Sequence, residues 1–292
     1  MIDGRRPAGF TEPQLRWLAG VSVAQFSKLV VELGPVWNAE HARRSKATVR
    51  EAGAGRPFEM VFATRLFVCL VYLRWNVSFR GLGAMVGFSK DTVNRAVHEC
   101  TQLLAEYGIT RPSGDRITDL AGLEEALVSI DHNAMVDGTF VVIQRPGGGW
   151  EAQKAEYSGH RHRHCRTTQV MTDGNGALLW VTDSEPGPTH DSTAFVSSGV
   201  GDLIVNGDGI LVADRGYRGM DKRIEGLDLL VPICGGPKGP GTWNTAHASL
   251  RVKVEHAIRT LKRRQILHGY RRLPDRLNDT IRATATLATL RA

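Results

Sequence analysis

The sequence lacks the cysteine pairs that would make a disulfide scaffold or a zinc ribbon. Its 292 residues include four cysteines, which lie far apart and form no Cys-x-x-Cys pair. No stretch approaches the roughly 20 consecutive apolar residues of a membrane span, and the first ten residues, "MIDGRRPAGF", contain no apolar signal core. No internal repeat and no low-complexity tract stands out. These absences predict a cytoplasmic protein that keeps its cysteines reduced and does not enter a membrane.

Acidic residues are also fewer than basic residues. Lysine and arginine number 37 against 30 aspartate and glutamate, which gives a net charge of +7 and an isoelectric point near 9.5. A basic chain favours an anionic partner such as nucleic acid, although many basic proteins bind nothing anionic. The charge therefore points toward nucleic acid without identifying it.

Residues 1–55 are predicted to form a helical arm and a linker. Thr11 and Ser22 precede apolar-periodic segments and are of the residue types that cap helix N-termini, because their hydroxyls accept a hydrogen bond from a free backbone N–H. The polar stretch at 38–58, which contains several arginines and glycines, interrupts this pattern. We expect an exposed linker there, able to touch a phosphate backbone.

Residues 56–110 are predicted to hold three helices in close order. The segment at 58–75 has a broad apolar face and suits a supporting helix. Two further helices, at 78–87 and 89–108, each begin at a serine cap and are joined by the short turn "GFS". Two helices joined in this way fit a helix-turn-helix DNA-binding domain.

The second helix of such a motif presents its first turns to the DNA major groove. Its exposed polar side chains near the N-terminus are Lys90, Asn94 and Arg95, which are therefore the candidate groove contacts. A plain three-helix packing unit is the alternative, and the caps and spacing leave it open.

From residue 127 onward the hydrophobic pattern changes to the period of two that is typical of strands. "NAMVDGTFVVIQ" and "RTTQVMTD" alternate in this way, and "GNG" then turns the chain into "ALLWVTD", which predicts a hairpin. A short helix from Asp191, the strand "GILVAD" and a long basic helix from about Ala248 follow. This order predicts an α/β domain with a mixed sheet over residues 127–292.

Three acids lie on apolar elements that would hold them rigidly. Asp137 interrupts one strand, Asp214 ends another, and Glu255 lies on the long helix. Carboxylates brought together without counter-charge raise one another's pKa and destabilise a site. Two divalent cations about 3.5–4 Å apart remove that conflict and promote displacement at a phosphodiester. Magnesium suits such oxygen ligands, with manganese as a substitute, because no His/Cys set is needed.

The final helix carries a charged stripe. Arg251, Glu255, Ile258 and Lys262 recur at steps of four, three and four, so they share one face. On this face an acid would hold metal while the cations grip phosphates. A solvated ladder of salt bridges, contributing about 0.3–0.5 kcal/mol per pair, explains the same spacing.

Four blocks of the sequence together resemble the DDE transposases of the Harbinger-like class and their bacterial insertion-sequence relatives. The blocks are "VDGTFVVI", the run from "YSGHRHRHC" to "GPTHDSTAF", "LVADRGYRG" and "RVKVEHAIRTLKR", and the likeness extends from Arg56 to the C-terminus. It implies a ribonuclease H-like fold in which Asp137, Asp214 and Glu255 are the catalytic, metal-binding acids. The sequence departs from the bacterial relatives at Ala248, where a tyrosine is frequent, so a contact to DNA there is absent or replaced.

The resemblance implies a transposase whose metal-activated water cuts a strand at the end of a mobile element. The freed 3′-hydroxyl would then attack target DNA. The implied partners are double-stranded DNA, as terminal inverted repeats and as target, and a second copy of the chain; a bacterial source would imply association with the nucleoid. A decayed, non-catalytic DNA-binding relative and a nuclease without strand transfer are the alternatives. The candidate phosphate contacts are Arg251, Arg259, Lys262, Arg263 and Arg264.

Two further features compete for the metal role. Asp191 in "PTHDSTAF" rivals Asp214 as the second acid, although a helix cap explains an aspartate at that place equally well. The run "GHRHRHC" would place His160, His162 and His164 on one face of a strand, as in a zinc site. The arginines between them instead favour an edge close to phosphates.

Overall fold

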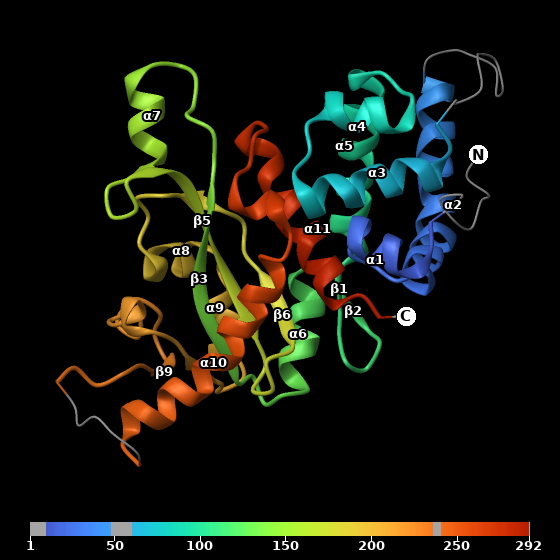
Figure 1. Ribbon diagram of the computed structural model, residues 1–292. Helices are drawn as coiled ribbons and strands as arrows, with labels where there is room; N and C mark the ends of the chain where they lie inside the picture. Colours follow the sequence, from blue (N-terminus) through green and yellow to red (C-terminus); the bar gives the residue numbers. More distant parts are fainter. Residues whose placement is uncertain (1–9, 48–59, 236–240, 292) are drawn as a thin grey trace. The chain divides into compact units, whose positions relative to one another are not determined.

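The computed structural model of the protein describes residues 10–47, 60–235 and 241–291 (Figure 1). The chain divides into two compact units. The first, here the helical unit, is Met1–Glu106 with Leu290–Ala292, and the second, here the α/β unit, is Tyr107–Thr289. Nowhere in the described ranges is a helix long and apolar enough to cross a membrane.

Helices make up the described part of the helical unit. They are α1 (Glu12–Ala19), α2 (Val23–Ala47), α3 (Phe62–Trp75), α4 (Phe79–Val86) and α5 (Lys90–Tyr107).

The helix caps predicted from the sequence are confirmed. The hydroxyls of Thr11, Ser22, Ser78 and Ser89 each accept a hydrogen bond from the backbone N–H three residues on, at 3.0–3.5 Å. Gly87 ends α4 with a φ of 75°, a left-handed conformation that glycine adopts without a steric cost. Local side-chain chemistry thus fixes where these helices begin and where α4 ends.

The exposed linker predicted at 38–58 is wrong over its first ten residues, because α2 continues to Ala47. Pro35 lies inside the helix, where a missing N–H usually causes a break or kink. Leu33 and Trp37, on either side of it, are buried to 5% and 6% exposure, and this packing outweighs the local cost. Residues 48–58 of that prediction lie outside the described residues.

Helix α3 supports the unit as expected. It is buried continuously from Phe62 to Leu73. Helices α4 and α5 follow it, joined by the three residues between Val86 and Lys90. Gly83 of α4 lies so close to this turn that a Cβ there would be 2.5 Å from the carbonyl oxygen of Phe88. Close packing of the turn against α4 therefore requires glycine at this position.

The α/β unit alternates strands with helices, as its sequence pattern predicts. Its strands in the described ranges are β1 (Ile109–Thr110), β2 (Arg116–Ile117), β3 (Ala134–Val142), β4 (Tyr157–Ser158), β5 (Arg163–Thr172), β6 (Leu178–Val181), β7 (Glu185–Pro186), β8 (Ile210–Val212) and β9 (Asp228–Leu230). Its helices there are α6 (Leu120–Val128), α7 (Trp150–Glu156), α8 (Asp191–Ser197), α9 (Val200–Val205), α10 (Trp243–Leu261) and α11 (Leu277–Thr289), with short 3₁₀ turns η1 (Arg215–Tyr217), η2 (Gln265–His268) and η3 (Pro274–Arg276).

The main sheet is mixed, which confirms the α/β prediction. Its strand order is β4-β5-β3-β8-β9, with β6 and β7 also paired to β5. Strand β3 is antiparallel to β5 and parallel to β8, and β8 is parallel to β9. The β5–β6 pair is the hairpin expected around "GNG". Central β3 is therefore flanked by strands of both directions.

Helices pack on this sheet and carry residues to it. Helix α10 contacts β3 and β5, α8 contacts β5, and α11 contacts β6 (Figure 1). Helix α10 begins at Trp243, capped by Thr242, which is five residues earlier than predicted. The sheet and α10 together position the candidate site.

Candidate active site

Asp137 and Asp214 lie at corresponding places on adjacent strands. Strand β3 pairs with β8 in parallel, with Met135 opposite Val212. Continuing this register by two residues brings Asp137 level with Asp214, the second residue after β8. The Asp214 carboxylate accepts a hydrogen bond of 2.7 Å from the Gly216 N–H, which holds it at the start of η1. Two acids distant in sequence thus lie together.

Arg251 links Glu255 to Asp137, one of these two acids. The guanidinium Nη2 of Arg251 lies 3.1 Å from Asp137 Oδ2 and 3.5 Å from Glu255 Oε1. The Asp137 side chain is 17% exposed, whereas that of Glu255 is 51% exposed. One arginine therefore links a half-buried acid of the sheet to an exposed acid of α10.

The charge of Asp137 is only partly compensated. Burial raises the pKa of this carboxyl from 3.8 to about 6. Arg251 opposes that rise, by its charge and its hydrogen bond, while the negative charge of Asp214 adds to it. A cation other than Arg251 would relieve this strain on the ionised form.

The donor chemistry at this place fits a hard divalent cation. Asp137, Asp214 and Glu255 offer carboxylate oxygens, the ligands that Mg²⁺ prefers. Arg251 already bridges two of the three acids with a single positive charge. Within the described ranges, however, no three Asp, Glu, His or Cys side chains form a group that could hold a metal ion as they stand.

Asp191 lies against β3, beside Asp137. Its sequence context left open whether it binds metal or caps a helix. A Cβ built on Gly138 would be 2.3 Å from Asp191 Oδ1, so the glycine after Asp137 makes room for this carboxylate. The same oxygen accepts hydrogen bonds from Thr167 at 3.3 Å and from Gln169 at 3.4 Å. Asp191 is the first residue of α8, and its side chain is tied to β5.

A buried network of two further residues, Gln169 and Tyr217, joins Asp191 to the Asp214 turn. The Tyr217 hydroxyl donates a hydrogen bond to Gln169 Oε1, and both side chains are fully buried. Burial raises the pKa of Tyr217, and the charges of Asp191, Asp137 and Asp214 raise it further. The three aspartates therefore lie near enough to Tyr217 for their charges to act on its hydroxyl. Sequence reasoning missed this pair, because a glutamine in a strand gives no local signal of its partner.

The candidate phosphate contacts in the last turn of α10 and just after it fall into two groups. Arg259 and Arg263 are exposed, and Lys262 lies over the Phe140 ring with its ammonium 4.4 Å from the ring centroid. Arg264 is only 5% exposed. Its backbone precedes η2, whose residues Ile266 and Leu267 are buried, so the chain turns inward here and does not bring Arg264 to the surface.

The candidate groove contacts all lie in the first two turns of α5. Lys90 and Arg95 are exposed, and Asn94 is half-buried. Val93 and Val97 of the same helix are fully buried, so this helix turns its valines inward and its cations outward.

The three histidines of "GHRHRHC" do not share a strand face. Strand β5 begins only at Arg163, and His162 has a φ of 52° in the preceding turn. The alternation that a zinc site would need is therefore broken between His160 and His164.

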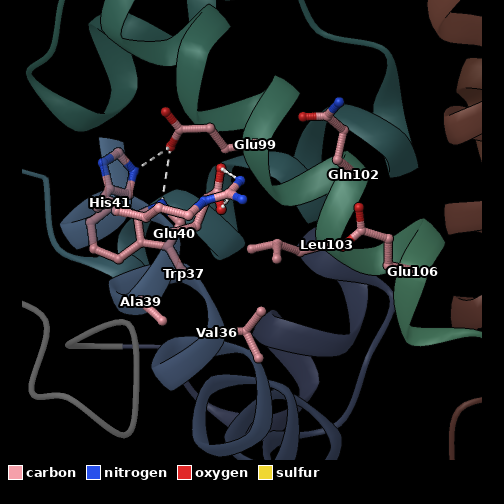
Figure 2. Close-up of a pocket in the computed structure, with 10 residues that line it drawn as sticks. Val36, Trp37, Ala39, Glu40, His41, Glu99, Gln102, Leu103 and Glu106 are labelled. Atoms are coloured by element: carbon pink, nitrogen blue, oxygen red, sulfur yellow. Dashed lines mark hydrogen bonds and ion pairs between the residues drawn. The ribbon is translucent and has the colours of Figure 1, made fainter. Parts of the chain in front are cut away.

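The helical unit contains a hollow of its own, of about 500 Å³, between α2 and α5. Figure 2 shows the Glu99 carboxylate in it, reaching toward Trp37 and His41. Glu99 accepts a hydrogen bond of 3.1 Å from Trp37 and pairs with Arg65 at 3.0 Å and His41 at 3.5 Å. Its acid is thus held by three partners.

The sequence model of the DDE superfamily endonuclease family matches residues 136–289, a range that includes Asp137, Asp214 and Glu255. The chain therefore belongs to the DDE superfamily endonucleases. It is also similar to a protein of Streptomyces albus G named "Putative transposase for insertion sequence element IS112", with 25% identity over 290 residues and 96% of each chain covered. The predicted resemblance to DDE enzymes of bacterial insertion sequences is confirmed.

Proposed function

We propose that this protein is a transposase that cuts DNA at the ends of a mobile element and joins the freed strand to target DNA. The observation that carries the proposal is the meeting of Asp137 on β3 with Asp214 just after the adjacent β8, and Arg251 links Asp137 to Glu255 on α10. The similarity to the Streptomyces protein supports the same activity. The catalytic part would be residues 127–292, in a ribonuclease H-like arrangement.

Asp137, Asp214 and Glu255 would hold two magnesium ions, with manganese as a substitute. When bound, such ions supply an activated water and stabilise the leaving oxygen of the phosphodiester. Without metal, the positive charge of Arg251 partly neutralises Asp137 and Glu255. The Nε of Arg251 is buried and has no hydrogen-bond partner among the described residues, so a substrate oxygen that reached it would satisfy this donor.

The remaining candidates bind the DNA around the cleavage point. Arg259, Lys262 and Arg263 extend the positive charge from Arg251 along the end of α10. Arg264 serves the packing of the chain instead, because it is buried. Double-stranded DNA, in the form of terminal inverted repeats and of target, is the proposed substrate, and a homo-oligomer holds two element ends.

Residues 56–110 would form a helix-turn-helix that recognises this DNA, after an arm at 1–55. Helices α4 and α5 and their short turn support this, as do Lys90, Asn94 and Arg95 at the start of α5.

The test is metal-dependent nicking of DNA that carries the element's own ends. Asp214→Asn is expected to lower cleavage about a thousandfold or more, because several kcal/mol of charge stabilisation are lost. DNA binding should be unchanged. Asp208→Asn is the matched control, since Asp208 is an exposed aspartate in the turn before β8. Cleavage by Asp214→Asn at the wild-type rate would remove Asp214 from the site.

The same assay separates transposition from its alternatives. Nicking without joined products would leave a nuclease, and binding without nicking would leave a non-catalytic DNA-binding protein.

The helix-turn-helix has its own test. Arg95→Ala should weaken DNA binding and reduce the slope of log affinity against log salt by about one, if Arg95 contacts a phosphate, or relax sequence preference if it reads a base. Arg111→Ala, which removes an arginine bonded to Ser129 in the α/β unit, is the control. An affinity unaffected by Arg95→Ala would contradict the choice of α5.

A further inference from the structure

A hollow of about 470 Å³ adjoins the acids of the α/β unit. Asp191 forms part of its wall, and the Asp191 carboxylate lies against Gly138, the residue after Asp137. The hollow therefore opens beside the proposed cleavage point. The residues that line it come from three segments: Phe140 of β3, Ser158–Arg161 with Cys165 and Thr167, and Gly187–Asp191.

Two cations share one aromatic ring at this hollow. The guanidinium carbon of Arg161 lies 3.9 Å from the centroid of the Phe140 ring, and the ammonium of Lys262 lies 4.4 Å from it. Each contact is a cation–π attraction, which holds a long side chain in place. Phe140 thus holds two positive groups, of which Arg161 itself lines the hollow and Lys262 contacts the Phe140 ring.

These two cations have no acidic partner. Within the described ranges neither Arg161 nor Lys262 forms an ion pair with a carboxylate. Burial lowers the pKa of Lys262, and the charge of Arg161 lowers it further. Like charges held together in this way attract an anion, and a phosphodiester is the anion that the neighbouring acids act upon.

The rest of the wall is polar, and it could contact the sugar and base of a nucleotide as well as its phosphate. Ser158, Thr189, His160 and His190 line it with hydroxyl and imidazole groups. Its volume falls within the range of about 300–1,000 Å³ that small-molecule sites occupy. Asp191, the one carboxylate among the lining residues, accepts hydrogen bonds from Thr167 and Gln169 through Oδ1, so that oxygen faces the strand.

We infer that this hollow receives one unstacked nucleotide of a DNA strand, next to the phosphate that is cut, with its own phosphate on Arg161 and Lys262. The inference rests on the proposed function. It gives the segment Ser158–Arg161 a role in holding the substrate strand. A duplex does not enter, because its bases are stacked and paired, so the nucleotide must leave the stack first.

The test is the binding of a fluorescent eight-nucleotide oligothymidylate to the full-length protein, in EDTA so that no strand is cut. Arg161→Ala is expected to weaken this binding about tenfold or more. Arg145→Ala is the matched control, because Arg145 is an exposed arginine of the same unit that does not line the hollow. Thr189→Trp keeps every charge and narrows the hollow, so it should weaken oligothymidylate binding while leaving duplex binding unchanged.

Equal losses in Arg161→Ala and Arg145→Ala would overturn the inference, since they would show general attraction by positive charge. Wild-type binding of oligothymidylate by Thr189→Trp would overturn it as well. Neither result depends on cleavage. A wild-type protein that binds the oligonucleotide through Arg161 and Thr189 but never cuts DNA would contradict the proposed function and leave this site standing.

Discussion

The two units of the protein treat buried acids in opposite ways. Glu99 of the helical unit has an arginine, an indole N–H and a histidine around one carboxylate. Asp137 of the α/β unit shares a single arginine with Glu255 and has Asp214 as a neighbour of like charge. Side chains of the fold provide all the partners of Glu99. The negative charge of Asp137 is only partly neutralised within the fold, so a bound cation would stabilise it. The contrast separates an acid that stabilises structure from one that serves chemistry.

The largest effect on stability is expected from Glu99→Gln. This change leaves Arg65, whose side chain is 6% exposed, as a buried charge without its carboxylate. Breaking a buried pair in this way costs about 3–5 kcal/mol. Urea unfolding followed by tryptophan fluorescence measures the loss, and cleavage per folded molecule should not change.

The matched control for Glu99 is Arg43→Gln in the same unit. Arg43 pairs with Glu40 at 2.8 Å, but its side chain is 79% exposed. An exposed pair contributes at most about 1 kcal/mol. Similar losses in the two variants would erase the distinction drawn for Glu99.

Ionised Asp137 is expected to destabilise the folded protein, whereas ionised Glu99 stabilises it. The folded-state pKa of Asp137 is about 6, above the ordinary 3.8, so the folded protein binds this proton more tightly than the unfolded chain. The contribution is fully present below about pH 4 and is lost as pH rises through about 6, for a total of at most about 3 kcal/mol. The charged neighbours of this carboxyl are Asp214 and Arg251, and Arg251 also pairs with Glu255.

Asp137→Asn should therefore flatten the stability profile of the metal-free protein between pH 4 and pH 7, while abolishing cleavage. Thermal unfolding in EDTA at several pH values measures the profile. Asp208→Asn should retain the wild-type slope. A profile in Asp137→Asn as steep as that of the wild type would show that burial does not penalise this carboxylate.

The smallest effect is expected from Tyr217→Phe. Removing the hydroxyl leaves Gln169 Oε1 buried without its donor, at a cost of about 1–2 kcal/mol. Combining it with Gln169→Leu should cost less than the sum of the two single changes by at least about 0.5 kcal/mol, because the residues act as a pair. Strict additivity in urea unfolding would show that Tyr217 and Gln169 do not act as a pair.

Local chemistry is what the sequence predicted well. Caps at Thr11, Ser22, Ser78 and Ser89 depend on neighbours three residues away, and the strands and the β5–β6 hairpin depend on alternation and turn residues. The family resemblance identified the three candidate acids more definitely than residue spacing did. Spacing alone also fits an exposed ladder of salt bridges that includes Glu255.

Tertiary contacts are what the sequence could not supply. Strand β9 is three residues long, and within the described ranges it pairs with β8 alone. Gln169 finds Tyr217 across 48 residues. Helix α2 passes Pro35 because buried neighbours hold it, and Arg264 is buried because the chain turns inward after α10. None of these leaves a periodic signal.

Binding of Mn²⁺ by the free protein, followed by electron paramagnetic resonance, tests the central claim without DNA or turnover. The account predicts that wild type and Asp208→Asn bind the ion alike, and that Asp137→Asn and Asp214→Asn each weaken binding about tenfold or more, as expected when a metal loses a carboxylate ligand. Equal binding by all four proteins would contradict the claim that these two acids form the metal site.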